Sequence, residues 1–407
     1  MLHLLPLSVA ADGIFTLTDR TEARARYPDP ITNQVALDVD TLVDARAVWT
    51  GHNATYTVAD LPRFTLLDFN GAAISPAFLD TLVLRGEWRW HRVQLHVNEN
   101  ASYGELSMES LSALPTPGTP SPSPNPTGAP VPLPSATLVP NTSSAIPFAS
   151  SDTSVGSVLD LRRWTLVPLA GYLITGGANA DAQATLPLQK GPYAEATADD
   201  KLGTRDHLAT YVSASETTFT PLETEDLLGD LEERWRRQWS HKTESLLAGG
   251  WYAARTRASA DAPDMFVAGP IAEAAVDEHL TRGVNATDLR FDVRLAPFIN
   301  RLTGLVDEQV RGTIEATWTH RRLRYRAFAS AAESTQQGTT TSARYGSAEI
   351  DATYKLSDVW SFDGGFRALY QEQNGNPIPG SNQPTVETLS QGIVFFAVTV
   401  RPVKTRF

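Results

Sequence analysis

The sequence contains no cysteine, which excludes disulfides, thiol catalysis, zinc–thiolate sites and iron–sulfur clusters. Lysine is scarce, with five residues against 29 arginines, and charged residues make up only 20% of the chain. The net charge of −12 argues against a general nucleic-acid-binding protein, which would have a basic balance. No run of 18 apolar residues is present, so the sequence offers no transmembrane helix.

The first apolar stretch of the 407-residue chain, residues 2–11, ends in Val9, Ala10 and Ala11. This ending is similar to the small-residue cleavage site of a secretory signal. The stretch is short and the first arginine is Arg20, so an ordinary apolar N-terminus is the alternative. We interpret residues 1–11 as a signal-peptide remnant and expect residues 12–407 to form a single domain.

Alternation of apolar and polar residues recurs from one end of the chain to the other and predicts strands. Leu289, Phe291 and Val293, for example, alternate with Arg290 and Asp292. Such segments are roughly 10–15 residues long, whereas soluble strands average about 5–6. One face carries almost no charge, and tryptophans stand near strand ends, as in the aromatic girdles of transmembrane barrels. The pattern favours an all-β transmembrane antiparallel barrel over a secreted soluble β-sandwich or propeller that binds carbohydrate.

The connections support an up-and-down barrel with 16–18 strands, because short and long connections alternate as they do in bacterial barrels. Short turns are expected at Arg162-Arg163 and at His320-Arg321, and long outer loops at 107–152 and 371–390. The 18 expected strands are 13–27, 33–49, 54–67, 78–90, 92–106, 153–162, 164–176, 191–201, 205–218, 228–240, 244–257, 264–279, 288–300, 306–319, 321–333, 343–356, 359–371 and 391–404.

Residues 114–150 differ from the rest of the chain, because they contain 11 prolines and neither lysine nor arginine. Such a stretch lacks amide donors for a sheet and apolar bulk for a core. We predict a disordered, polyproline-like outer loop. It is either a tolerated insertion or a docking loop for a partner or a surface polymer.

The segment 354–367, YKLSDVWSFDGGFR, resembles the strand, tight turn and Trp-led strand of Gram-negative outer-membrane β-barrels, a porin-like class. Phe407 is similar to the terminal aromatic that serves this class as an assembly signal, although Arg401, Thr405 and Arg406 interrupt the usual apolar alternation before it. More narrowly, the chain is similar to the porin-like barrels of polysaccharide-export systems. The resemblance implies an outer-membrane location, contact with outer-membrane lipids and the barrel-assembly machinery, and a polysaccharide-export lipoprotein as partner.

A barrel of 16–18 strands is wide enough for an aqueous lumen, whose charges would set selectivity. The alternative is that these charges pair across neighbouring strands and stiffen the wall. The acidic stripe of Asp38, Asp40 and Asp44 is interpreted as a solvated lumen face and not as a calcium site. The predicted lumen-lining residues are Arg85, Glu87, Arg89, Arg234, Arg236, Arg290, Asp292, Arg294, Arg311, Glu315, Arg322, Arg324 and Arg326.

No catalytic signature is recognisable: the Gly-x-Ser-x-Gly elbow, the His-Glu-x-x-His motif and a phosphate-binding glycine loop are all missing. We therefore expect no enzyme activity, no metal and no cofactor. The sequence predicts an outer-membrane passive or export channel with an Arg/Asp/Glu-lined lumen, and polysaccharide is the expected cargo. The alternative is a non-conducting barrel that acts as a surface scaffold or docks a partner.

Overall fold

The computed structural model describes residues 12–27, 34–67, 75–107, 145–257, 263–300, 304–336, 342–374 and 388–406. The strands are β1 (Asp12–Tyr27), β2 (Ala36–Thr50), β3 (Ala54–Asp60), β4 (Arg63–Leu67), β5 (Ser75–Trp90), β6 (Val93–Ser107), β7 (Ala145–Leu161), β8 (Trp164–Gly177), β9 (Leu188–Lys201), β10 (Asp206–Thr220), β11 (Glu225–Gln238), β12 (Thr243–Arg257), β13 (Met265–Arg282), β14 (Asn285–Asn300), β15 (Leu305–His320), β16 (Leu323–Gln336), β17 (Ser342–Lys355), β18 (Trp360–Asn374) and β19 (Thr388–Arg406).

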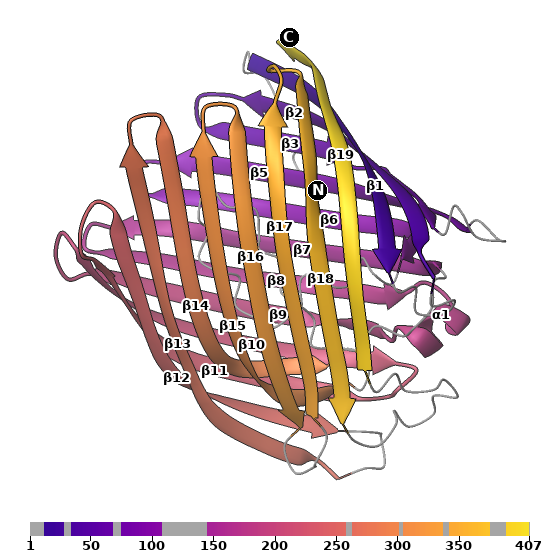
Figure 1. Ribbon diagram of the computed structural model, residues 1–407. Helices are drawn as coiled ribbons and strands as arrows, with labels where there is room; N and C mark the ends of the chain where they lie inside the picture. Colours follow the sequence, from indigo (N-terminus) through magenta and orange to yellow (C-terminus); the bar gives the residue numbers. More distant parts are fainter. Residues whose placement is uncertain are drawn as a thin grey trace, which may run out of the picture.

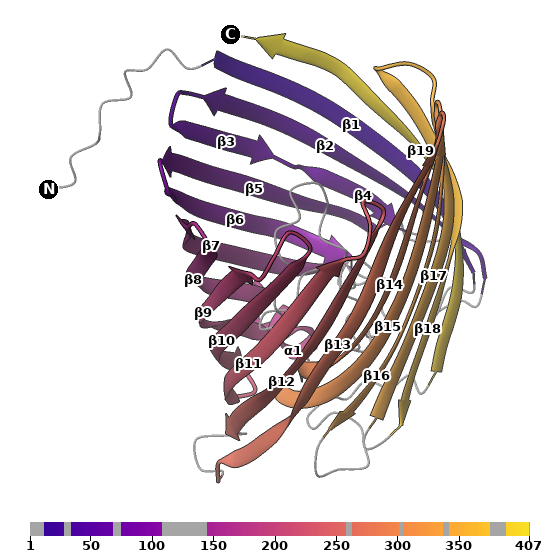
Figure 2. The same ribbon diagram turned by 90° about the vertical axis from the view of Figure 1, so that its left-hand side faces the viewer.

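These strands form one closed antiparallel barrel of 18 strands (Figures 1 and 2). Consecutive strands pair along the chain, and β19 pairs with β1 to close the sheet. β3 and β4 together form one barrel strand, since β2 and β5 each pair with both of them. The predicted fold class and strand number are confirmed. Closure satisfies the backbone groups that an open sheet edge would leave unpaired in a membrane.

The interruption between β3 and β4 follows from Pro62, which has no N–H to donate to a sheet. The neighbouring backbone groups remain bonded across it. Leu61 N donates to Thr81 O at 2.9 Å, and Val43 N donates to Pro62 O at 3.0 Å. The ladder is therefore irregular here without being broken.

Short turns join the strands at one end of the barrel and the longer connections join them at the other, as the sequence predicts. The two-residue turn between β7 and β8 consists of Arg162 and Arg163, and Arg162 has a left-handed φ of 71°. Arg321, in the turn between β15 and β16, has a φ of 52°. The connection between β10 and β11 is shorter than expected, because the strands extend to Thr220 and resume at Glu225.

The Pro-rich segment ends earlier than predicted. Residues 145–150, expected in the disordered loop, belong to β7, which starts eight residues before the expected position 153. Ile146 and Phe148 explain the difference, because both side chains are buried in an apolar cluster. Residues 114–144 of the predicted loop, the signal-like residues 1–11 and the assembly signal Phe407 lie outside the described residues.

One short helix, α1 (Ala180–Thr185), lies in the connection between β8 and β9 and was not predicted. Asn179 caps it by accepting a hydrogen bond from Ala182 N at 2.9 Å. Within the described ranges, no helix is long and apolar enough to cross a membrane.

Candidate channel lumen

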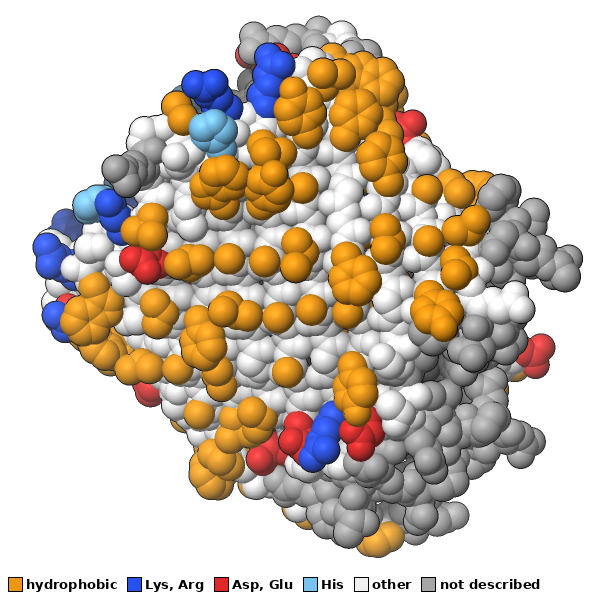
Figure 3. Space-filling view, viewed as in Figure 1, with side chains coloured by type: hydrophobic (Ala, Val, Ile, Leu, Met, Phe, Trp, Pro, Cys, Tyr) orange, Lys and Arg blue, Asp and Glu red, His pale blue; other side chains and the backbone are white. Residues whose placement is uncertain are grey.

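Side-chain direction alternates along each strand and gives the barrel two chemically different faces. On β14, Leu289, Phe291 and Val293 are 37–49% exposed and point outward, whereas Arg290 and Asp292 point to the inner face. Hydrophobic side chains are spread over the outward face of β12–β19, and charged side chains gather mainly near its edges (Figure 3). An apolar exterior around a polar interior is the arrangement of a transmembrane barrel.

Ion pairs link the inner faces of β11–β15. Glu232, whose side chain is fully buried, accepts from Arg234 Nε at 3.1 Å and from Arg294 Nη2 at 2.7 Å. Arg294 also contacts Glu273 at 3.0 Å, so one guanidinium neutralises two carboxylates on different strands. Several strands are therefore joined through side chains as well as through the backbone.

The network continues over β15–β18. Arg326 Nε lies 2.7 Å from Glu315 Oε1, and Arg326 Nη1 lies 4.0 Å from Glu349. Arg367 on β18 contacts the same Glu349 at 2.8 Å. Opposite charges thus alternate around this part of the wall, and each is close to a counter-charge.

A second network holds β1, β2 and β4 together. Asp40 on β2 is contacted by Arg24 from β1 at 2.5 Å and by Arg63 from β4 at 2.6 Å. Asp38 pairs with Arg26 at 3.1 Å, and both side chains are buried. The interpretation of the acidic stripe as a solvated face is wrong for Asp38 and Asp40, because arginines from neighbouring strands cover them. Among the described residues, no group of three or more His, Asp or Glu side chains could hold a metal ion.

Apart from Arg322, the other predicted lumen residues also lie on the inner face of their strands, most of them within 4 Å of an opposite charge. Arg85 and Arg324 are exposed there and form no ion pair with a described residue. The remaining pairs are Arg89 with Glu87 at 3.2 Å, Arg236 with Glu244 at 3.8 Å, Arg290 with Asp277 at 3.7 Å and Arg311 with Asp292 at 3.6 Å.

Arg322 is the exception among the predicted residues. It lies in the tight turn before β16 and not on the strand, and its Nη1 donates to Leu356 O in the neighbouring turn at 2.9 Å. The turn occupies Arg321 and Arg322, so alternation begins only at Leu323. The expected basic ladder of three arginines is therefore shortened to Arg324 and Arg326.

Two inward-folded elements at the loop end were not predicted. The end of the β14–β15 hairpin packs on the inner face of β10–β13, where Ile299 and Val306 join Phe219, Leu228 and Tyr252 in a buried apolar cluster. The close approach requires glycine at position 304, which has a φ of +64°, because a Cβ there would lie 3.0 Å from the Phe219 ring. The only sequence signal is the run 297–299, Pro-Phe-Ile, in which two adjacent large residues interrupt the alternation.

The second inward-folded element is the α1 connection. Ala182 and Leu186 pack against Leu106, Ile146 and Phe148 at the loop end of β6 and β7. Both elements place apolar side chains on the inner side of the wall, at the end that carries the long connections.

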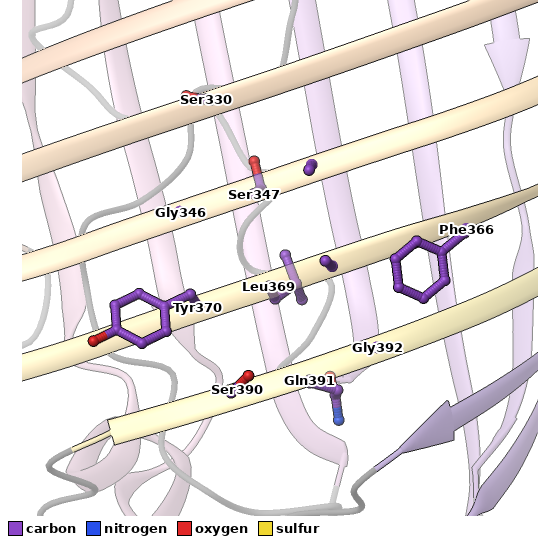
Figure 4. Close-up of a pocket in the computed structure, with 11 residues that line it drawn as sticks. Ser330, Gly346, Ser347, Phe366, Leu369, Tyr370, Ser390, Gln391 and Gly392 are labelled. Carbon is purple, nitrogen blue, oxygen red and sulfur yellow. The ribbon is translucent and has the colours of Figure 1, made fainter.

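A shallow depression between Phe366 and Tyr370 lies on β17–β19 (Figure 4). Both rings are exposed on the outward face, at 48% and 41%, and Gly346 and Gly392 leave the space beside them. Because it opens mainly to the outside of the barrel, this depression is not part of the lumen.

The model of the EpsX exopolysaccharide export family matches residues 6–377. The chain belongs to this family. The match covers nearly all of the described barrel, so the family relationship concerns the barrel itself. The predicted relationship to a polysaccharide-export family with a porin-like barrel is confirmed.

Solved structures similar to this EpsX-family chain include proteins of two organisms. OccK1 (OpdK) of Pseudomonas aeruginosa is 9% identical, with a TM-score of 0.48 over 97% of this chain and 99% of the other. OccAB3 of Acinetobacter baumannii is 10% identical, with a TM-score of 0.45 over 98% of this chain and 100% of the other. A search of curated protein sequences gives no match.

Proposed function

We propose that this EpsX-family barrel is located in the outer membrane and is a channel through which exopolysaccharide leaves the cell. The observation that supports this most strongly is the closed 18-strand barrel, which has an apolar exterior and a polar interior. The chain also belongs to a family named for exopolysaccharide export. Barrels of 16–18 strands leave room for an aqueous channel. A polymer of sugars is strongly hydrated and requires such a polar path across an apolar layer.

In this proposal passage is passive, and the diameter and the charge of the lumen select the solute. The paired arginines and carboxylates stiffen the wall, because most of the ion pairs join neighbouring strands. Selectivity depends more on Arg85 and Arg324, which are exposed and have no ion pair within 4 Å among the described residues. A solute in the lumen can reach their guanidinium groups without first breaking an ion pair.

The proposal also includes a polysaccharide-export lipoprotein at the periplasmic mouth, and assembly of the barrel by the outer-membrane insertion machinery. The turn end of the barrel carries exposed cationic residues, among them Arg162, Arg321 and Arg322. Cross-linking from a photoreactive residue at position 321, followed by identification of the captured protein, tests this partner. Capture of a lipoprotein supports it, and its absence under conditions that export polysaccharide contradicts it.

The first experiment compares unboiled and boiled outer-membrane fractions on a denaturing gel, because closed barrels resist detergent until heated. A shift in mobility is expected. Single-channel recording in planar bilayers then tests conduction directly. A folded barrel that carries no current would contradict the channel and favour the non-conducting scaffold.

Charge selectivity provides the finer test. Arg85→Glu with Arg324→Glu should move the reversal potential in a salt gradient toward cation preference, because lumen substitutions tune selectivity. Arg344→Gln is the matched control, since Arg344 lies on the outward face beside Glu333 and should leave selectivity unchanged. An equal shift in both variants would contradict the assignment of the inner face.

A further inference from the structure

The inner face of β6–β9 differs from the rest of the wall. Its side chains are amides, hydroxyls, apolar groups and a few carboxylates, among them Asp152 and Glu195, and Lys201, at the turn end, is its only described lysine or arginine. Outward neighbours such as Val155 and Tyr172, 48% and 44% exposed, fix which residues of these strands point inward. This arc therefore lacks the ion-pair network that covers β11–β18.

Tyr193 lies flat across this arc. It stands on β9 directly opposite Gly171 of β8, and its Oη donates to Asp152 Oδ1 on β7 at 2.7 Å. Strands are about 4.8 Å apart, so a side chain that starts on β9 and bonds to β7 must run along the wall above β8. A Cβ at position 171 would lie 2.5 Å from Tyr193 Cζ, which shows that the ring rests on the glycine.

A second ring rests on a second glycine beside it. His96 of β6 is paired with Gly156 of β7, and a Cβ there would lie 2.2 Å from His96 Nε2. Both side chains therefore lie over a glycine on the inner side of the wall, and both residues are partly exposed. The two glycines lie on neighbouring strands and are offset by two residues, so strand geometry places them about 8 Å apart.

Polar and apolar groups surround the two rings. Asn98 Nδ2 lies 3.5 Å from Ser154 Oγ between them, and the Asp152 carboxylate is held at the end of Tyr193. Leu169 and Leu173 flank Gly171 on the same face of β8. Flat aromatic faces beside amide, hydroxyl and carboxylate groups match a pyranose, which has an apolar C–H face and a rim of hydroxyls.

We propose that His96, Asn98, Asp152 and Tyr193 form a contact site for neutral hexose rings on the lumen wall. This inference rests on the proposed function and adds to it the part of the wall along which the sugar chain moves. The aromatic faces stack on successive sugars, and the polar groups exchange hydrogen bonds with hydroxyls as the chain advances. The arginine-rich walls contribute rigidity and not sugar contacts.

The test measures how long maltoheptaose blocks the current through single channels of the full-length protein. Tyr193→Leu should shorten the mean block by about threefold to tenfold, because it removes the stacking face. Tyr193→Phe keeps the ring and should stay within about twofold. Tyr345→Leu is the matched control, since Tyr345 is a buried tyrosine on the opposite wall, in β17. A polyethylene glycol of the same mass should block all variants alike.

The outcomes separate this site from the channel function. If the variants conduct and maltoheptaose blocks Tyr193→Leu for as long as it blocks Tyr345→Leu, the sugar site is refuted and the channel function is not. If neither the wild-type protein nor any variant conducts, the channel function is refuted. Saturation-transfer NMR of maltoheptaose with the detergent-solubilised, heat-modifiable protein then tests the sugar site by itself. The site is supported if saturation transfer from the protein to maltoheptaose is lost in Tyr193→Leu and kept in Tyr193→Phe. It is refuted if the wild-type protein gives no transfer.

Discussion

Arg294 offers the sharpest test of the inner-wall network, because one guanidinium contacts two carboxylates. Its Nη2 lies 2.7 Å from Glu232 and its Nη1 lies 3.0 Å from Glu273, and the three side chains are 14%, 0% and 12% exposed. Arg294→Met keeps much of the side-chain volume and removes the charge. We expect it to destabilise the barrel strongly without preventing its assembly.

The magnitude follows from what remains after the substitution. Removing one partner of a buried ion pair costs about 3–5 kcal/mol, since it leaves an uncompensated buried charge. Arg234 still lies 3.1 Å from Glu232, so chiefly Glu273 loses its counter-charge. The expected loss in free energy of unfolding is therefore near the lower bound, about 3 kcal/mol.

The assay is reversible guanidinium unfolding in lipid vesicles, followed by tryptophan fluorescence. Arg344→Met is the matched control, because the Arg344–Glu333 pair is about half exposed on both sides, and such pairs contribute about 0–1 kcal/mol. Equal losses in the free energy of unfolding for the two variants would refute the idea that the inner pairs stabilise the barrel more because they are buried. A second check is Arg294→Met with Glu273→Gln, which should recover part of the loss.

Three further substitutions test separate parts of the structure. Val293→Arg places a charge on the outward face and should cost roughly 2–4 kcal/mol in the same unfolding assay, whereas a neutral result would invert the assignment of the two faces. Ile299→Asp should release the hairpin end from the inner wall and raise single-channel conductance, and an unchanged conductance would show that this end does not narrow the pore. Gly171→Ala should lift the Tyr193 ring and shorten maltoheptaose block as Tyr193→Leu does, with heat-modifiability as the check on folding.

The barrel could be predicted because strand pairing between neighbours in sequence needs only local information. Alternation marks each strand, and turn residues such as Arg162 and Arg163 mark each reversal, so strand number and order follow along the chain. Strand ends were less predictable where packing decides them. β7 starts at Ala145 because Phe148 finds a buried environment beside Leu106 and Leu186, which are distant in the sequence.

The inward-facing set could also be predicted from alternation, but the contacts within it could not. Whether Asp40 is solvated or covered depends on Arg24 and Arg63, which reach it from two neighbouring strands. Likewise, Tyr193 rests on Gly171 only because the register of β8 and β9 places them opposite each other. Register is fixed by the whole closed sheet, and no short segment of sequence contains it.

In the proposed channel, the ion-paired part of the wall over β11–β18 and the part over β6–β9 have different roles. An arginine in an ion pair has donors already occupied, so a passing neutral polymer must compete with a carboxylate for them. The Glu232, Glu273 and Arg294 cluster is such a set, because Arg294 lies within 3.0 Å of both carboxylates. The amide of Asn98 and the exposed ring face of Tyr193 have no comparable competitor. In the channel that we propose, sugars are held weakly and released repeatedly. Such groups suit this role better than charges, because each contact is small and every step along the chain replaces it with a similar one.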